Sequence, residues 1–165
     1  MEKLKVAFEK IGEISRDVAL DVIRDYPNLD MRIERRKQEI ENPWRLSTDD
    51  NVGGGKPQNV RSEPIEKALE LKEADDELNL YYWKRDAVEH VLKLCVDKQA
   101  RSLLDRATYD IIYEFYLREN QIFNADGIAA RVKLSRRSVY NRRDAFIEAV
   151  RKELDRTAQK LHKTV

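Results

Sequence analysis

Glycine and proline, the residues that most often end helices and form turns, are scarce in this chain. Its 165 residues include only five glycines and four prolines, and three of the glycines are consecutive. Most of the chain therefore lacks the closely spaced turn signals that a β-sandwich or barrel needs. The composition, 41% hydrophobic and 38% charged, is typical of a folded protein rich in surface helix. We expect an all-α fold.

The N-terminal segment, residues 1–42, carries apolar residues at helical spacing. This spacing predicts an amphipathic helix over residues 3–25. Tyr26-Pro27 should end it, because the residue before a proline disfavours the α conformation. A second, more polar helix is expected from there to Glu41. The residues that set the first pattern are Leu4, Ala7, Phe8, Ile11, Ile14, Val18 and Val22.

Residues 43–63 contain the three glycines, two prolines and almost nothing to bury apart from Trp44. We interpret them as a flexible linker. The stretch GGGKP is not a phosphate-binding loop, because Lys56 precedes a proline and no Ser or Thr follows it. Ser62 is a candidate cap for the next helix, with Pro64 in the first turn.

Residues 64–100 predict a long central helix. Two series of residues seven apart run along it, and all but one of their members are apolar. Such heptads indicate pairing along the helix, either with the N-terminal helices, which we favour, or with a second copy in a homo-oligomer. The two series are Leu71, Leu78, Arg85 and Leu92, and Ala74, Tyr81, Val88 and Cys95.

No residue pattern marks a catalytic or metal site. Cys95 lies on the apolar stripe and is expected to be a core thiol, and His90 and His162 are isolated. We therefore expect no enzyme, no metal and no cofactor. No apolar run approaches the ~18 residues of a membrane span, and the N-terminus lacks a signal-peptide core. A soluble, intracellular protein without a membrane partner is expected.

Charge is distributed unevenly along the chain, although the net charge is only +1. Residues 124–165 contain eleven Lys and Arg against five Asp and Glu, a net of +6, and residues 1–123 have a net of −5. The densest part, residues 131–152, has eight basic and two acidic residues. Such a cluster is typical either of a surface that binds a polyanion or of an ordinary solvated helix face.

Residues 101–165 have the sequence form of a helix-turn-helix domain. A helix over about 106–119 is followed by a short helix that Asn124 can cap, a tight connection at Lys133-Leu134, and a final helix that Ser135 can cap. This final helix could extend to about His162. Its apolar residues should pack on the short helix and on the helix before it, with Ile112, Phe115, Ala129, Leu134 and Val139 in the core.

The beginning of the final helix has the chemistry of a DNA reader. Arginine can bond guanine, and asparagine adenine, through two hydrogen bonds in the major groove. Hydroxyls, cations and free backbone N–H groups at a helix start suit phosphates. The expected base-reading residues are Arg136, Arg137, Tyr140 and Asn141. The expected phosphate contacts are Asn124, Lys133, Ser135, Ser138, Arg142 and Arg143.

Three segments support a family resemblance. Residues 122–154, IFNADGIAARVKLSRRSVYNRRDAFIEAVRKEL, resemble the helix-turn-helix of region 4 of bacterial sigma factors. Together with RDYPNLD and ERRKQEIENPW at 24–44, and the linker DDNVGGGKPQNVRSEPIEKALEL at 49–71, they resemble the RinA-like phage transcriptional activators, which are related to the ArpU-type late-gene regulators.

The resemblance implies a DNA-binding activator of phage or prophage late genes that binds double-stranded promoter DNA and contacts the host RNA polymerase. It would act in the bacterial cytoplasm, associated with the nucleoid. The alternatives are a small terminase subunit, which would form a ring of many subunits, and an interaction module that binds no nucleic acid.

Overall fold

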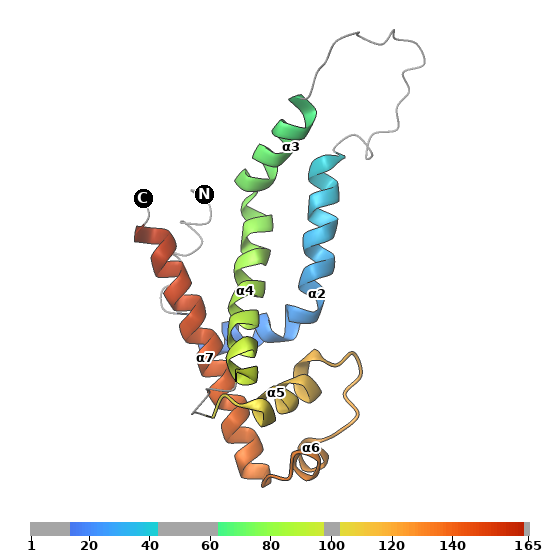
Figure 1. Cartoon of the computed structure of the whole chain (residues 1–165), viewed down its shortest axis with the longest axis vertical. Coiled ribbons are helices and arrows are strands. Elements are labelled where there is room, and N and C mark those ends of the chain that lie inside the picture. Colours follow the sequence, from blue (N-terminus) through green and yellow to red (C-terminus); the bar gives the residue numbers. More distant parts are fainter. Residues whose placement is uncertain (1–13, 43–62, 98–102, 164–165) are drawn as a thin grey trace.

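The computed structural model describes residues 14–42, 63–97 and 103–163, and this part of the chain is all-helical (Figure 1). The expected all-α class is confirmed. The elements are α2 (Arg16–Glu41), α3 (Glu63–Ala74), α4 (Asp76–Val96), α5 (Arg106–Ile112), a π-helical turn η2 (Tyr113–Leu117), α6 (Ala125–Val132) and α7 (Arg136–Lys163).

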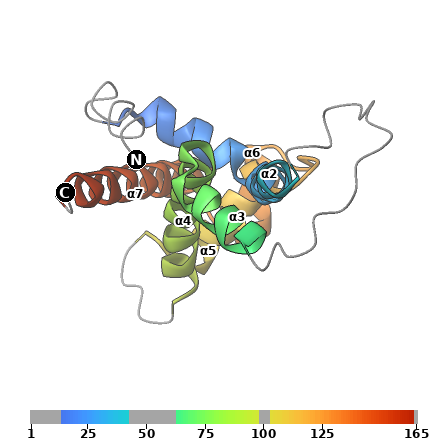
Figure 2. The ribbon, with the colours of Figure 1, turned by 90° about the horizontal axis from the view of Figure 1, so that it is seen from above.

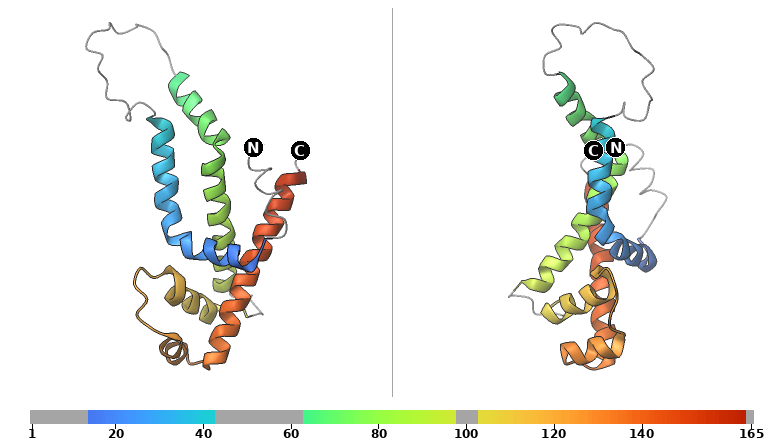
Figure 3. Two further views of the ribbon diagram at one scale, coloured as in Figure 1. Left: turned by 180° about the vertical axis from the view of Figure 1, so that it is seen from behind. Right: turned by 90° about the vertical axis from the view of Figure 1, so that its right-hand side faces the viewer.

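Three long helices form the main core. Helix α4 lies between α7 and the C-terminal part of α2, and the α6–α7 turn and α3 lie at opposite ends of the molecule (Figures 2 and 3). The heptad members on α4 are buried within the chain at Leu78, Val88, Leu92 and Cys95, which agrees with pairing inside the molecule. The two members that lie on α3, Leu71 and Ala74, are exposed instead. The indole of Trp83 on α4 donates a 2.8 Å hydrogen bond to the Thr157 hydroxyl on α7. The fully buried side chains of this core include Ile23, Val88, Val91, Ile112, Phe146, Ile147, Val150 and Leu154.

Helix α2 contradicts the expected break at Tyr26-Pro27. Pro27 lies inside this helix, which continues to Glu41 and bends sharply along its length (Figure 1). A proline removes one helical hydrogen bond and its ring crowds the carbonyl of residue i−4, so the backbone kinks there. Tertiary packing compensates for this cost, because Ile23 and Leu29 on either side of Pro27 are completely buried.

The single central helix predicted over residues 64–100 is interrupted at Asp75. The Asp75 carboxylate accepts a 2.7 Å hydrogen bond from the backbone N–H of Leu78 and so caps α4. The same carboxylate accepts a 2.7 Å hydrogen bond from Arg36 on α2. The N-terminal cap of α4 and the ion pair between Asp75 and Arg36 of α2 therefore favour the break, whereas the heptad pattern continues through it unchanged.

The helix expected over 106–119 also changes form. It is α-helical to Ile112 and π-helical over Tyr113–Leu117, where the Arg118 N–H donates to the Tyr113 carbonyl at 3.0 Å. The π-helical turn shifts the face that its residues present, and Glu114 becomes buried at 3% exposure.

Some sequence-based expectations lie outside the described residues. These are the beginning of the 3–25 helix, the linker up to residue 62 with Trp44, and the Ser62 cap. Helix α3 begins at Glu63 with Pro64 in its first turn, where a proline is compatible with helix geometry.

We predict that Phe146→Ala destabilises the protein by about 3–5 kcal/mol, because Phe146 is fully buried at the contact of α7 with the main core and its truncation leaves a cavity. Urea unfolding measures this loss. The control is Met31→Ala, which removes a side chain that is 67% exposed and should change stability by less than about 0.5 kcal/mol. Equal losses in the two variants would contradict the assigned core.

Candidate nucleic-acid interface

Both helices of the α6–α7 pair begin with the caps expected from the sequence. The Asn124 side chain accepts a 2.9 Å hydrogen bond from the Gly127 N–H and starts α6. The Ser135 hydroxyl accepts a 3.2 Å hydrogen bond from the Ser138 N–H and starts α7. Each cap satisfies one of the backbone N–H groups that a helix start leaves without an intrahelical partner.

The turn between the two helices is closed by backbone hydrogen bonds. Lys133 adopts the left-handed conformation, with φ 56° and ψ 42°, and is the one non-glycine residue with positive φ among those described. Its N–H donates to Ala130 O at 3.3 Å, and the Leu134 N–H donates to Ala129 O at 3.0 Å. This pair of bonds is a Schellman motif, which ends α6 and turns the chain directly into α7.

A small second core fixes the angle between α6 and α7. It consists of Ile111, Ile128, Ala129 and Val139, with Phe115, Phe123, Val132 and Leu134 packed at its edge. The expected members are confirmed except for Ile112, which lies in the main core instead. Ile111 takes its place, because α5 packs against elements of both cores and neighbouring residues of a helix point about 100° apart, so Ile111 and Ile112 reach different cores.

Opposite this core, the beginning of α7 presents polar side chains to solvent. Arg136, Arg137 and Asn141 are exposed, and so is Lys133 in the turn. We call these four residues the basic tip. Lys133, Arg137 and Asn141 make no side-chain hydrogen bond or ion pair with another residue in the described ranges, so their donors remain available to a ligand. The basic tip lies at the end of the molecule farthest from α3 (Figure 3).

Tyr140 and Arg143 form a layer beside the basic tip. The Arg143 guanidinium lies 4.8 Å from the centroid of the Tyr140 ring and 5.9 Å from that of Phe115. Its Nη2 also lies 2.8 Å from Asp144, which in turn pairs with Arg16 of α2 at 2.6 Å. Arg143 is thus engaged within the protein, and its side chain is only 26% exposed.

Arg142 does not point into solvent, as the expected phosphate contact would require. Its side chain is 17% exposed and turns toward the start of α5, where it forms an ion pair with Asp105. It also donates to the Thr108 hydroxyl at 3.2 Å. Burial alone would raise the pKa of Asp105, but the hydrogen bonds from Arg142 and from the Thr108 N–H outweigh it and lower the pKa below its usual value. Arg142 therefore fastens α7 to α5.

Three carboxylates in this region form ion pairs that the sequence did not predict. Asp105 holds Arg142, and Asp126 on α6 lies 3.3 Å from Arg136. Glu114 lies 2.8 Å from Arg118 and 3.2 Å from Arg131, which joins η2 to α6. A pattern of helical spacing indicates only which face a carboxylate occupies, so a partner on another element could not be identified from it.

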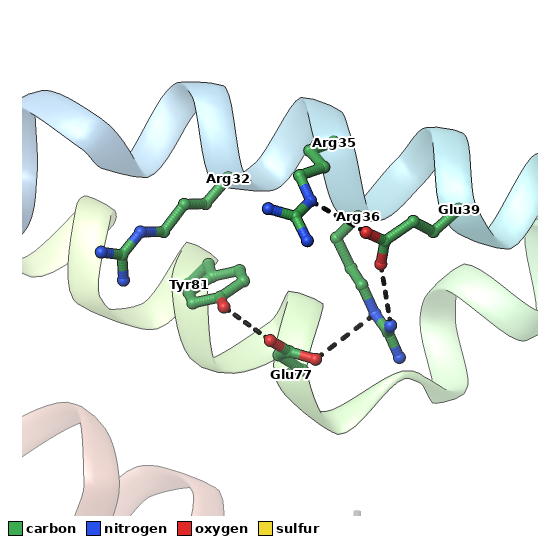
Figure 4. A pocket seen from close by; sticks show the side chains of 6 residues that line it. All are labelled: Arg32, Arg35, Arg36, Glu39, Glu77 and Tyr81. Atoms are coloured by element: carbon green, nitrogen blue, oxygen red, sulfur yellow. Dashed lines mark hydrogen bonds and ion pairs between the residues drawn. The ribbon is translucent and has the colours of Figure 1, made fainter.

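A second group of arginines lines a groove of about 330 Å³ between α2 and α4 (Figure 4). Arg35 and Arg36 share Glu39, at 2.9 and 3.1 Å, and Arg36 also reaches Asp75 and Glu77. Arg32 pairs with Asp25 at 2.9 Å. The positive charge of this groove is neutralised by carboxylates of the same molecule, so we interpret it as a brace between the two helices.

The remaining candidate chemistry is limited. Burial raises the pKa of the Cys95 thiol to about 11, which keeps it protonated and unreactive at neutral pH. Residues 14–42, 63–97 and 103–163 include no group of three His, Cys, Asp or Glu side chains that could hold a metal ion. No helix in these ranges is both long and apolar enough to cross a membrane.

The fold and the surface define an all-helical protein in which α7 joins the two cores. The basic, solvent-exposed start of α7 lies at one end of the molecule. The chain belongs to the family described as protein of unknown function DUF722, whose family model matches residues 16–152. This match covers α2 to α6 and more than half of α7, and so includes the whole basic tip. No curated protein and no solved structure matches the chain.

We predict that Lys133→Gly stabilises the protein by about 1 kcal/mol, because glycine adopts the left-handed conformation without the strain of a β-carbon. Urea unfolding measures the gain. Lys133→Ala is the matched control: it removes the same charge, keeps the strain and should leave stability nearly unchanged. A Lys133→Gly protein no more stable than Lys133→Ala would contradict the assigned turn geometry.

We predict that Asp105→Asn makes stability less sensitive to acid. The ionised Asp105 stabilises the fold above its unfolded pKa of about 3.9, and this contribution is lost as the pH falls through its lower folded pKa. Asparagine keeps the helix cap but removes the ion pair, so the variant should be about 1 kcal/mol less stable than the wild type at pH 7. When the pH is lowered from 5 to 2, the free energy of unfolding should fall less in the variant than in the wild type. Urea unfolding across this pH range tests it, with the surface variant Asp110→Asn as control. An acid profile identical to that of the wild type would refute the role of Asp105.

Proposed function

We propose that this protein binds double-stranded DNA with sequence specificity and activates transcription of phage or prophage late genes. The observation that carries the proposal is the position of Arg137 and Asn141. They lie one helical turn apart at the capped start of α7, exposed and without a side-chain partner among the described residues. The apolar side of the same helix is buried in both cores.

This arrangement supports major-groove binding. A helix that enters the groove by its N-terminal end brings its first two turns to the base edges. At this distance Arg137 can donate two hydrogen bonds to guanine, and Asn141 can pair with adenine. Lys133 and the backbone N–H groups that begin α7 would contact phosphates alongside.

The rest of the molecule supports a role beyond DNA binding. Helix α7 continues from the basic tip into the main core, so a bound helix start would orient α2, α3 and α4 rigidly with respect to the DNA. Leu69 and Leu71 on α3, at the opposite end, are 58% and 49% exposed. We propose that this end contacts the host RNA polymerase or a second copy of the protein.

The structure leaves fewer cations for phosphate contacts than the sequence predicts. Arg142 and Arg143 are engaged within the protein, so Arg131 and Lys133 are the exposed cations beside the proposed base readers. About two neutralised phosphates would lower DNA affinity by about one decade between 50 and 200 mM salt.

We predict that Arg137→Ala and Asn141→Ala each weaken binding to the phage's late-gene control region by about 1–3 kcal/mol, because each removes a base contact. Fluorescence anisotropy with this duplex and with a scrambled duplex, at 50 and 200 mM salt, measures the effect. Binding to the scrambled duplex should change less for Asn141→Ala than for Arg137→Ala, which also removes a charge.

The control for this experiment is Arg35→Ala, whose side chain is 80% exposed but lies in the α2–α4 groove and not at the basic tip. It should bind as the wild type does. If the wild-type protein binds the control-region duplex and the scrambled duplex with equal affinity, sequence-specific activation is rejected. Light scattering on the same samples tests the packaging alternative, since a stable ring of eight or more subunits would favour a small terminase.

A further inference from the structure

An ion pair joins the two helix starts at the basic tip. Asp126 is the second residue of α6, and Arg136 is the first residue of α7. The Arg136 Nη1 lies 3.3 Å from the Asp126 Oδ2, and the two side chains are 61% and 63% exposed. The carboxylate therefore lies on the same solvent-facing surface as the proposed base readers.

A second contact holds the Arg136 guanidinium from another side. It lies 5.8 Å from the centroid of the Tyr140 ring, which is itself packed against Phe115 and Arg143. Hydrogen bonding to the Tyr140 hydroxyl, followed by the charge of Asp126, raises the pKa of Arg136. Arg136 is thus oriented by two neighbours, whereas Arg137 has no such contact in the described part of the chain.

The charge of Asp126 affects DNA groups differently. An exposed ion pair contributes little to stability, but it restricts where the guanidinium points. A carboxylate beside Arg136 repels an approaching phosphate and leaves the uncharged base edges unaffected. A guanidinium has five N–H donors, so the two directed at Asp126 and at the Tyr140 hydroxyl leave three for a bidentate contact with guanine.

We propose that Asp126 is a positioning residue for base recognition, which directs Arg136 to a guanine and away from the DNA backbone. This inference rests on the proposed DNA-binding function. A purely structural role is the competing explanation, because an acidic residue in the first turn of α6 also interacts favourably with the helix dipole. The two roles differ in whether Asp126 affects base preference through Arg136.

The experiment selects bound duplexes from a randomised pool with the full-length protein and reads the base preference at each position. The proteins are the wild type, Asp126→Asn, Asp126→Glu, Arg136→Ala and the double variant Asp126→Asn with Arg136→Ala. Thermal unfolding, monitored by circular dichroism, verifies that each variant is folded.

We expect Asp126→Asn to bind random duplex more tightly, because a negative charge is lost, and to reduce the preference for guanine at one position by about tenfold. Asp126→Glu should restore part of that preference. Arg136→Ala should lose the preference at the same position, and adding Asp126→Asn to it should cause no further change.

Unchanged base preference in Asp126→Asn would overturn the positioning role and leave only general electrostatics. A change that persists in the Arg136→Ala background would also overturn it, because Asp126 would then act on the DNA without Arg136. A wild-type protein that selects no sequence at all would reject the proposed function, and the positioning role with it; this result is distinct from the other two.

Discussion

The burial of one side of α7 is the constraint on which the rest of the structure depends. Val139 packs with α6 in the small core, and Phe146, Val150 and Leu154 pack with α2 and α4 in the main core. A single helix of 28 residues, about 42 Å long, therefore belongs to both cores and joins them rigidly. Because its apolar side is packed in both cores, the opposite side of its first turns stays exposed to solvent.

The same helical geometry separates the arginines at the start of α7. Arg136 and Arg137 precede Val139 and lie outside the core contact. Arg142 comes three residues after Val139 and four before Phe146, so it lies at the edge of the buried side, where a guanidinium needs a partner. Asp105 supplies that partner from the start of α5. The charged cluster is thus divided between a structural contact and an exposed surface that suits a polyanion.

Helix type could be predicted from the sequence more reliably than helix continuity. Apolar spacing correctly indicated helices on both sides of Pro27 and of Asp75, but it could not show that the chain bends and stays helical at the proline and is interrupted at the aspartate. Both outcomes depend on contacts between elements: the burial of Ile23 and Leu29 beside the kink, and the ion pair that Arg36 of α2 forms with Asp75. Local propensity is a weak guide where such contacts compete with it.

The sequence by itself determined the all-α class, the caps at Asn124 and Ser135, the short α6 and the exposure of Arg136, Arg137 and Asn141, because periodicity and capping are local properties. Only the tertiary structure decided which charges remain available. Asp105, Asp126 and Glu114 each find an arginine that is distant in sequence or on another element, and the strength and direction of an ion pair depend on the distance between charges in space, which the order of residues does not contain.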